Sequence, residues 1–335
     1  MSSIDVSVKS AGFRLWRRYI GIVVKRVLLA APRGYCAGVE RAVETVERAL
    51  AQNGPPVYVR KQIVHNSHVV DELRQRGAVF VGSVEDVPEG GLVVFSAHGI
   101  APVVRAGAAA RSLRTIDATC PLVTKVHSEA KRYAVEGYTV VLVGHAGHEE
   151  VEGTMGEAPE SIVLVESVAD AEQLEVDDPQ RVAYITQTTL SVDETSVIVA
   201  VLRRRFPSLH GPEKEDICYA TTNRQQAVKE LLPHVQLLLV LGSPNSSNSQ
   251  RLVEVARSAG VPAHLIESTE ALDERWLEGV ETLGVTSGAS APESLVEDLR
   301  NWFHGRGVAE IRELTPAKEN VVFKLPAELG RRPAA

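Results

Sequence analysis

The stretch VLLAAPRGYCAGVERAVETVERALA, residues 27–51, decides how this chain folds. It opens with a short apolar run, passes through a turn broken by proline and glycine that carries Cys36, and continues from Val39 with apolar residues three and four positions apart. A continuous apolar run bounded by turn residues is typical of a buried strand, and the later spacing indicates a helix. The stretch therefore predicts a strand, a cysteine-bearing turn and a helix, in that order.

Two later stretches are expected to repeat this order around the other cysteines. In DATCPLVTKVH, residues 117–127, Cys120 is followed by Pro121, and proline is tolerated at the first position of a helix. In DICYATTNRQQ, residues 216–226, Cys218 comes just before a helical pattern. Further apolar strands between the cysteines also end in small or polar residues. Since ligands collect at the carboxyl ends of parallel strands, these residues predict a shared site.

The fold class expected is α/β, with three related α/β domains whose mainly parallel sheets surround a central cavity. The expected divisions are residues 38–120 for the first domain, 121–217 for the second, and 27–37 together with 218–305 for the third. Residues 1–26 carry six basic side chains and one acidic one, and are expected to form a poorly ordered extension. An organelle address, or a start codon assigned upstream of the true one, is the alternative for this extension.

The composition of the 335 residues limits the classes of function. The formal net charge is −7 and 5% of the residues are aromatic, so the chain offers neither bulk attraction to nucleic-acid phosphates nor many stacking platforms. The longest apolar run near the start, residues 19–24, is far shorter than a membrane span needs. Three scattered cysteines do not form the paired framework of a small secreted domain, so a reducing, cytoplasmic location is expected.

The three cysteines allow two interpretations. Free cysteine is often simply buried, so three unrelated core cysteines would need no ligand. Alternatively, three thiolates at equivalent strand ends converge on a metal. Structural zinc sites usually have paired CxxC motifs, which this sequence lacks, so iron and sulfide fit better. A 4Fe-4S cluster held by three thiolates leaves one iron without a protein ligand, able to act as a Lewis acid and to deliver electrons.

Histidines and hydroxyl groups gather in the loops that follow the apolar strands. These loops contain His65, His98, His145, His148, the SSNS stretch at 246–249 and the SGAS stretch at 287–290. A single loop histidine is usually only solvated. Several of them, with hydroxyl and amide groups nearby, form a set of neutral donors suited to a diphosphate.

Carboxylates and threonines beside these loops are candidates for proton transfer and for orienting a ligand. They are Glu149, Glu150 and Glu152, directly after His148, and Thr186, Thr188 and Thr189 in TQTTL. The carboxylates either shuttle protons or form a solvated acidic turn. The threonines either orient a bound hydroxyl group or cap the next helix.

Nine ordered blocks of the sequence together resemble one protein family. They are PRGYCAGVERA, VHN, FSAHG, DATCPLVTKVH, GHAGHEEVEGT, TQTTLS, DICYATTNRQ, GSPNSSNS and GVTSGASAP. From about Val27 to about Leu325 the chain is similar to the LytB family of 4-hydroxy-3-methylbut-2-enyl diphosphate reductases. The resemblance implies the last step of the non-mevalonate isoprenoid pathway. In that step an allylic hydroxyl group is removed with two electrons and two protons, which gives isopentenyl diphosphate, dimethylallyl diphosphate and water.

The resemblance also implies roles for single residues, by their match to the family's motifs. Cys36, Cys120 and Cys218 would hold a 4Fe-4S cluster, Glu150 would donate a proton, and Thr188 would orient the substrate hydroxyl. The residues implied to bind the substrate are His65, His98, His148, Thr188, Asn223, Ser246, Ser247, Asn248 and Ser290. The tail, residues 306–335, would close over the site. A ferredoxin or flavodoxin type protein would supply the electrons.

The chain departs from the family pattern at one position of the implied site. The family often has proline in its GHPEVEG motif where this chain has Glu149. The additional carboxylate either alters the proton supply or faces water. Two other classes of function stay open, a zinc-dependent hydrolase that uses the three cysteines with a histidine, and a non-catalytic iron–sulfur sensor of oxidants.

Overall fold

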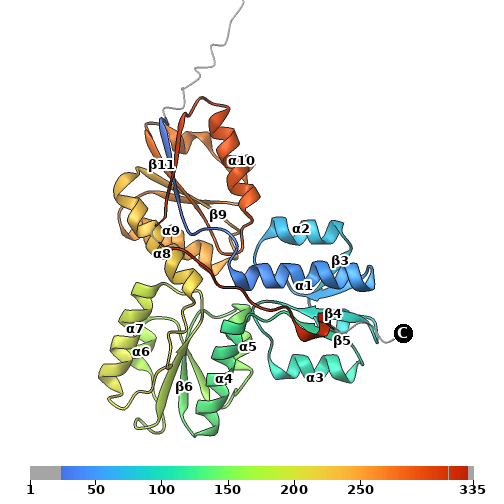
Figure 1. The fold of residues 1–335 in the computed structure, drawn as a ribbon. Helices are drawn as coiled ribbons and strands as arrows, with labels where there is room; N and C mark the ends of the chain where they lie inside the picture. The colour runs from blue at the N-terminus through green and yellow to red at the C-terminus, as the bar shows by residue number, and fades with distance from the viewer. Residues whose placement is uncertain (1–23, 316, 331–335) are drawn as a thin grey trace, which may run out of the picture.

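Three parallel sheets, each covered by helices on both faces, make up this α/β protein (Figure 1). The structure is a computed structural model and describes residues 24–315 and 317–330. Every strand pairing that it describes within a sheet is parallel, which confirms the expected fold class. The predicted extension at residues 1–26 lies outside the described residues, apart from Val24, Lys25 and Arg26.

The first sheet has the strand order β3-β2-β4-β5. Its strands are β2 (Val57–Arg60), β3 (Ala78–Val81), β4 (Leu92–Phe95) and β5 (Arg114–Asp117), and its helices are α1 (Ala37–Asn53), α2 (Ser67–Gln75) and α3 (Pro102–Ala110). Helices α1 and α2 cover one face, where Val46 and Leu73 pack against Val94 in one core cluster. Helix α3 covers the other face, where Ala108 packs with Phe95 in a second cluster.

The second sheet has the strand order β7-β6-β8. Its strands are β6 (Thr139–Val143), β7 (Ile162–Val165) and β8 (Val182–Thr186), and its helices are α4 (Pro121–Val135), α5 (Glu149–Met155), α6 (Val168–Gln173) and α7 (Val192–Arg205). Helices α4 and α5 share a core cluster with one face of this sheet, and α6 and α7 share one with the other face. The start of helix α7 is capped by Ser191, whose hydroxyl accepts a hydrogen bond from the Glu194 N–H.

The third sheet has the strand order β10-β9-β11-β1-β12 and places the first described strand beside the last one. Its strands are β1 (Arg26–Ala30), β9 (Leu237–Leu241), β10 (Ala263–Ile266), β11 (Thr282–Ser287) and β12 (Glu310–Leu314), and its helices are α8 (Tyr219–Leu231), α9 (Ser247–Ser258) and α10 (Glu293–His304). Alternate residues of β1 point to opposite faces, so Val27 packs against α10 while Leu28 packs against α8 and α9. In the part of the chain that the structure describes, five short 3-10 helices lie at Val84–Asp86, Leu232–His234, Thr269–Ala271, Glu274–Leu277 and Ala327–Gly330.

One part of the predicted repeat is wrong. Cys36 follows β1 and Cys120 follows β5, as expected, but Cys218 follows an irregular connection after α7 and not a strand. This connection, residues 206–217, includes Pro207, Gly211 and Pro212, and proline cannot donate to a strand ladder. The expected domain boundaries themselves stay predictions.

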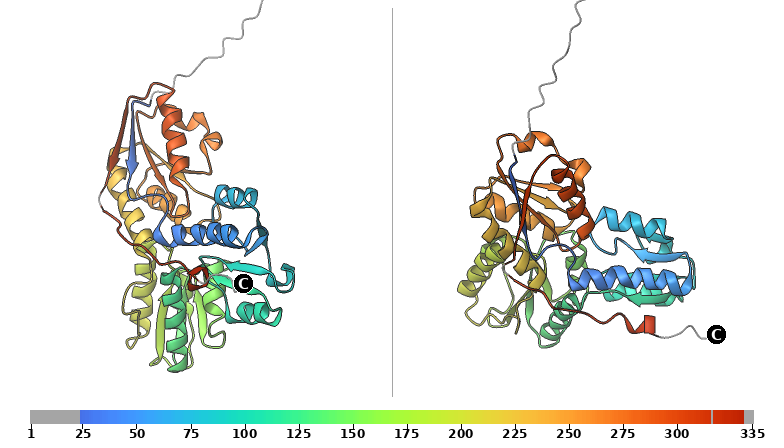
Figure 2. Two further views of the ribbon diagram at one scale, coloured as in Figure 1. Left: turned by 45° about the vertical axis from the view of Figure 1, so that its right-hand side comes forward. Right: turned by 45° about the horizontal axis from the view of Figure 1, so that its top comes forward.

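The chain after β12 returns from the third sheet to the first (Figure 2). Arg41 on α1 donates a hydrogen bond to the Lys324 carbonyl, and Leu329 is buried in the core of the first sheet. The residues that line the central cavity end at Ser290, so closure of this tail over the site stays a prediction. Among the described residues, no helix combines the length and the apolar character that a membrane span requires.

Candidate active site

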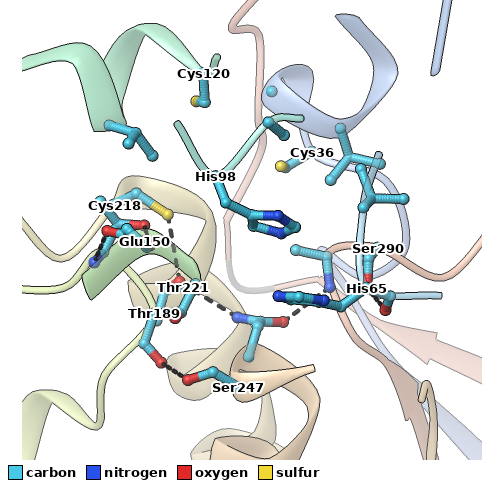
Figure 3. A pocket seen from close by; sticks show the side chains of 18 of the residues that line it. Cys36, His65, His98, Cys120, Glu150, Thr189, Cys218, Thr221, Ser247 and Ser290 are labelled. Carbon is cyan, nitrogen blue, oxygen red and sulfur yellow. Dashed lines mark hydrogen bonds between the residues drawn. The ribbon is translucent and has the colours of Figure 1, made fainter. Parts of the chain in front are cut away.

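A cavity lies where the carboxyl ends of strands from all three sheets meet (Figure 3). Its empty space measures about 670 Å³, including the part open to solvent. The predicted site residues that line it are Cys36, His65, His98, Cys120, His148, Glu150, Thr188, Cys218, Ser246, Ser247, Asn248 and Ser290. These residues come from loops and helix starts far apart in the sequence, so the fold brings them together.

Each cysteine occupies the N-cap position of a helix. Cys36 precedes α1, Cys120 precedes α4 and Cys218 precedes α8, and none of the three side chains makes a capping hydrogen bond. The start of a helix has unpaired N–H groups and the positive end of the helix dipole, which favour a negatively charged group. Three helix dipoles therefore point at the cysteines and favour their thiolate form.

The sulfur atoms of Cys36 and Cys120 are near neighbours. A Cβ atom built on Gly38 would lie 2.7 Å from the Cys120 sulfur and 3.8 Å from the Cys36 sulfur. The Cys218 sulfur lies 3.3 Å from the Thr221 hydroxyl, on the opposite side of the cavity. The fully buried Arg224 helps to fix this arrangement, because its guanidinium on α8 donates a hydrogen bond to the Gly34 carbonyl in the turn before Cys36.

The thiols need a cation to ionise. Burial, together with the charges of the other cysteines, raises the pKa of Cys120 to about 12 and the pKa of Cys218 to about 11. Neutral thiols are therefore favoured at pH 7 in the metal-free chain. A positively charged metal group would displace their protons, so metal binding is coupled to proton release.

The spacing of the sulfurs fits a group larger than one ion. A Zn–S bond is about 2.3 Å long, so two sulfurs on one zinc ion lie within about 4.6 Å of each other. Among the described residues, one group offers three ligand atoms within 4.8 Å of one another, and it consists of His65, His98 and Glu149. The three cysteine sulfurs do not form such a group, so at least one pair of them lies farther apart than this. A cluster of several iron and sulfide ions suits three soft ligands spread in this way.

Glu150 is a buried carboxyl group held from two sides by Thr188. The Thr188 N–H donates a hydrogen bond of 2.6 Å to Oε1, and the Thr188 hydroxyl lies 3.0 Å from Oε2. Burial raises the pKa of Glu150 to about 7, and the nearby charge of Asp216 adds to the increase, while the hydrogen bonds from Thr188 oppose it. At neutral pH a large fraction of Glu150 is therefore protonated and able to give up a proton.

Three histidine rings form a second cluster in the cavity. His65 and His98 are stacked, with ring centres 3.9 Å apart, and His148 stands edge-on to both. Burial lowers the pKa of His65 and of His148 to about 3, and that of His98 to about 4. His148 Nδ1 accepts a hydrogen bond from the Glu150 N–H, which leaves the proton on Nε2. The rings are therefore neutral in the free protein.

Hydroxyl and amide groups complete the cavity wall beside the histidines. The Ser246 hydroxyl caps α9 by accepting a hydrogen bond from the Ser249 N–H, and the Ser290 hydroxyl donates to the His65 carbonyl. Asn248 accepts a hydrogen bond from the Ala289 N–H. Asn223 is the exception among the predicted site residues, because its amide donates to Glu319 of the C-terminal tail and it is not part of the cavity wall.

The chain is similar to proteins of one known family. The family model described as LytB protein matches residues 27–304. The chain belongs to the LytB family.

Relatives of this LytB chain are similar over nearly their whole length. A 4-hydroxy-3-methylbut-2-enyl diphosphate reductase from Acidothermus cellulolyticus is 60% identical over 308 residues, which cover 92% of this chain and 91% of the relative. A second reductase of that name, from Mycobacterium tuberculosis, is 59% identical over 306 residues, which cover 91% of each protein. The solved structure of the E-1-hydroxy-2-methyl-but-2-enyl-4-diphosphate reductase from Plasmodium falciparum is 40% identical. It aligns with a TM-score of 0.89 and covers 91% of this chain and 97% of its own.

Sequence reasoning missed two polar residues of the LytB site. Asp216 is buried, accepts a hydrogen bond from the Thr186 N–H and pairs with Lys125 at 2.7 Å, and its charge acts on Glu150. Thr221 connects the Cys218 sulfur to the Asn248 amide. Both lie in the DICYATTNRQ block, three residues or fewer from Cys218, so their position in that block was the available signal.

Changing Gly38 to alanine is expected to remove most of the bound iron and sulfide. The new methyl group would lie 2.7 Å from the Cys120 sulfur, so the sulfur has to move. Overpacking of this kind costs about 1–3 kcal/mol. Gly107→Ala is the matched control, since a methyl group in the middle of α3 meets ordinary contacts of 3.4 Å and more. Iron and sulfide contents measured after anaerobic purification check the prediction, and equal contents in the two variants would contradict it.

Proposed function

We propose that this LytB chain is a 4-hydroxy-3-methylbut-2-enyl diphosphate reductase. It would remove the allylic hydroxyl group of its substrate with two electrons and two protons, releasing water, isopentenyl diphosphate and dimethylallyl diphosphate. One observation carries the proposal: three N-cap cysteines and a protonatable buried carboxyl group line the same cavity as a cluster of neutral diphosphate donors. Relatives that are about 60% identical over more than nine tenths of the chain are named as this reductase, and their similarity supports the proposal.

Cys36, Cys120 and Cys218 would hold a 4Fe-4S cluster with one iron free of protein ligands. Their soft thiolate character, their position in one cavity wall and the space left by Gly38 fit such a group. When bound, the cluster would supply electrons and a Lewis-acidic iron for the leaving oxygen. The three helix N-termini would stabilise the negative charge of the thiolates.

Glu150 would protonate the leaving hydroxyl group. Glu150 lies in the cavity wall and is 2% exposed, so its carboxyl group is shielded from bulk solvent. The two hydrogen bonds from Thr188 fix the direction in which the carboxyl group points. Thr188 also lines the cavity, and since its hydroxyl donates to Glu150 it can accept a hydrogen bond from the substrate hydroxyl.

The histidine and serine end of the cavity would bind the diphosphate. His148 offers an Nε2–H, since its Nδ1 already accepts a hydrogen bond. Ser246, Ser247, Asn248 and Ser290 add hydroxyl and amide groups from the ends of β9 and β11. Fixing the diphosphate at this end would place the allylic hydroxyl near the cysteines, which lowers the entropy cost of the reaction.

Electrons would come from a ferredoxin or flavodoxin type protein in the cytoplasm. A reducing compartment suits a chain with three unpaired cysteines. The family resemblance supports this part of the proposal.

Anaerobic turnover tests the proposed function. Purified protein with its cluster is mixed with 4-hydroxy-3-methylbut-2-enyl diphosphate and a chemically reduced viologen dye, and the products are separated. The proposal predicts loss of substrate and formation of both isopentenyl and dimethylallyl diphosphate. An intact cluster without turnover would support the non-catalytic sensor in its place.

A further inference from the structure

Glu149 places an additional carboxylate against the diphosphate end of the cavity. It is the first residue of α5, and its Oε2 lies 3.5 Å from Nδ1 of His98. Both side chains are 14% exposed. Neither atom has a hydrogen-bond partner or contact with water, and the same is true of His65 Nε2. Three unpartnered polar atoms from two domains therefore meet in one place.

These atoms present a charge problem for a bound diphosphate. Glu149 lies behind His98, which lines the cavity. The histidines nearest to Glu149 are neutral in the free protein, so no cation would lie between its carboxylate and phosphate oxygens bound on the cavity side of His98. The other charged and titratable groups around the pair are Lys61 on the first sheet, which is paired with Glu152 at 2.7 Å, His145 beside His148, and His127, which is bonded to Glu157 behind Gly99. None of these separates Glu149 from the phosphates.

A single metal ion is a poor solution to this charge problem. The His65 and His98 rings are inclined by only 18°, with centres 3.9 Å apart. The lone pair of an imidazole nitrogen lies in the plane of its ring, so an ion in the plane of one ring would lie well outside the plane of the other. A proton between His98 and Glu149 does not require both rings to point at one place. The distance of 3.5 Å between His98 Nδ1 and Glu149 Oε2 allows a hydrogen bond after a small shift.

We propose that Glu149 makes diphosphate binding depend on the uptake of one proton by His98. The imidazolium would donate from Nδ1 to the Glu149 carboxylate and from Nε2 to a phosphate oxygen, so that one positive charge lies between two anions. Glu149 is then a positioning residue that acts through His98. The inference rests on the proposed diphosphate substrate.

The direction of the pH effect follows from the two states of His98. In the free protein burial lowers the pKa of His98 to about 4, so the ring is neutral at physiological pH. Between two anions the charged form is stabilised, so the pKa of His98 rises on binding. The affinity for the diphosphate is then highest at low pH. It falls by a factor of about ten per pH unit between the pKa of His98 in the free protein and its pKa in the complex. Above the higher value, the unprotonated pair repels the ligand.

Calorimetry with isopentenyl diphosphate as the probe tests the inference on the cluster-loaded protein. Titrations at pH 7.5 in two buffers of different ionisation enthalpy measure proton uptake, at a pH where the phosphate, with its pKa of about 6, is almost fully ionised. The wild-type protein is expected to take up about one proton more per ligand than Glu149→Gln and Glu149→Ala. Any uptake by Glu150, whose pKa is about 7, is common to all three proteins. At pH 9 both variants are expected to bind about tenfold more tightly than wild type, the scale of one neighbouring carboxylate.

Glu160→Gln is the matched control, because it removes one negative charge at an exposed position after α5. It is expected to take up as many protons as wild type. Equal uptake by wild type and both Glu149 variants would overturn the inference and leave the proposed function intact. Affinity that requires Mg²⁺, without proton uptake, would also overturn it in favour of a cation. Failure of every variant and of wild type to bind the probe would overturn the proposed function as well.

Discussion

Replacing Glu150 with glutamine is expected to lower turnover by roughly 100-fold or more, the scale of lost general-acid catalysis. Glutamine keeps the size of the side chain, and its amide oxygen can still accept the hydrogen bond from the Thr188 N–H. The variant can therefore occupy the same place without a proton to give. Cluster content and affinity for isopentenyl diphosphate are expected to stay near the wild-type values, which separates proton donation from folding and binding.

The pH profile of the same variant adds a second readout. Because burial raises the pKa of Glu150 to about 7, the carboxyl group loses its proton above that pH. Wild-type turnover is expected to fall about tenfold per pH unit on the alkaline side, and the variant is expected to lack this decline. Glu160→Gln serves again as the charge control. Near wild-type turnover of Glu150→Gln, or an unchanged alkaline decline, would remove Glu150 from the proton-donating role.

Cys120→Ser is expected to abolish cluster binding and turnover while the chain stays folded. Serine is a hard oxygen ligand and a poor substitute for a thiolate on iron. Serine is also a favoured N-cap residue, so the start of α4 is expected to lose no stability. Iron and sulfide contents, turnover, and thermal unfolding of the metal-free proteins are the measurements that check this.

Thr124→Ser is the matched control for this cysteine. Thr124 lies one turn further along α4, where its hydroxyl donates to the Cys120 carbonyl, and serine can keep that hydrogen bond. The control is expected to hold a normal cluster. A full cluster and normal turnover in Cys120→Ser would show that this sulfur is not one of the ligands.

Much of the architecture could be predicted because local patterns agree with the fold. The apolar runs before Cys36 and Cys120 are buried strands, and Pro121 stands at the first position of α4. The loops with His98 and His148 follow β4 and β6, as parallel α/β packing requires. The prediction of a strand before Cys218 was wrong, because this segment is an irregular connection held by tertiary contacts. One of them is the hydrogen bond from the Thr186 N–H to Asp216.

The relations between distant residues could not be predicted from local patterns. Thr188 holds Glu150 across 38 positions of sequence, and the raised pKa of Glu150 depends on burial that only the assembled fold provides. Asn223 belongs to a matching motif, yet its amide turns to Glu319 in the tail. Glu149 follows a strand of the second sheet and His98 follows a strand of the first, so their contact depends on how the two sheets pack together. The sequence therefore left open whether this carboxylate faces water.

The iron and sulfide content of anaerobically purified protein, with low-temperature spin-resonance spectra of the reduced protein, tests the central claim most directly. The account predicts about four iron and four sulfide ions per chain, and a spectrum that changes when 4-hydroxy-3-methylbut-2-enyl diphosphate is added. Zinc without sulfide, or a cluster whose spectrum does not change when the substrate is added, would contradict the account.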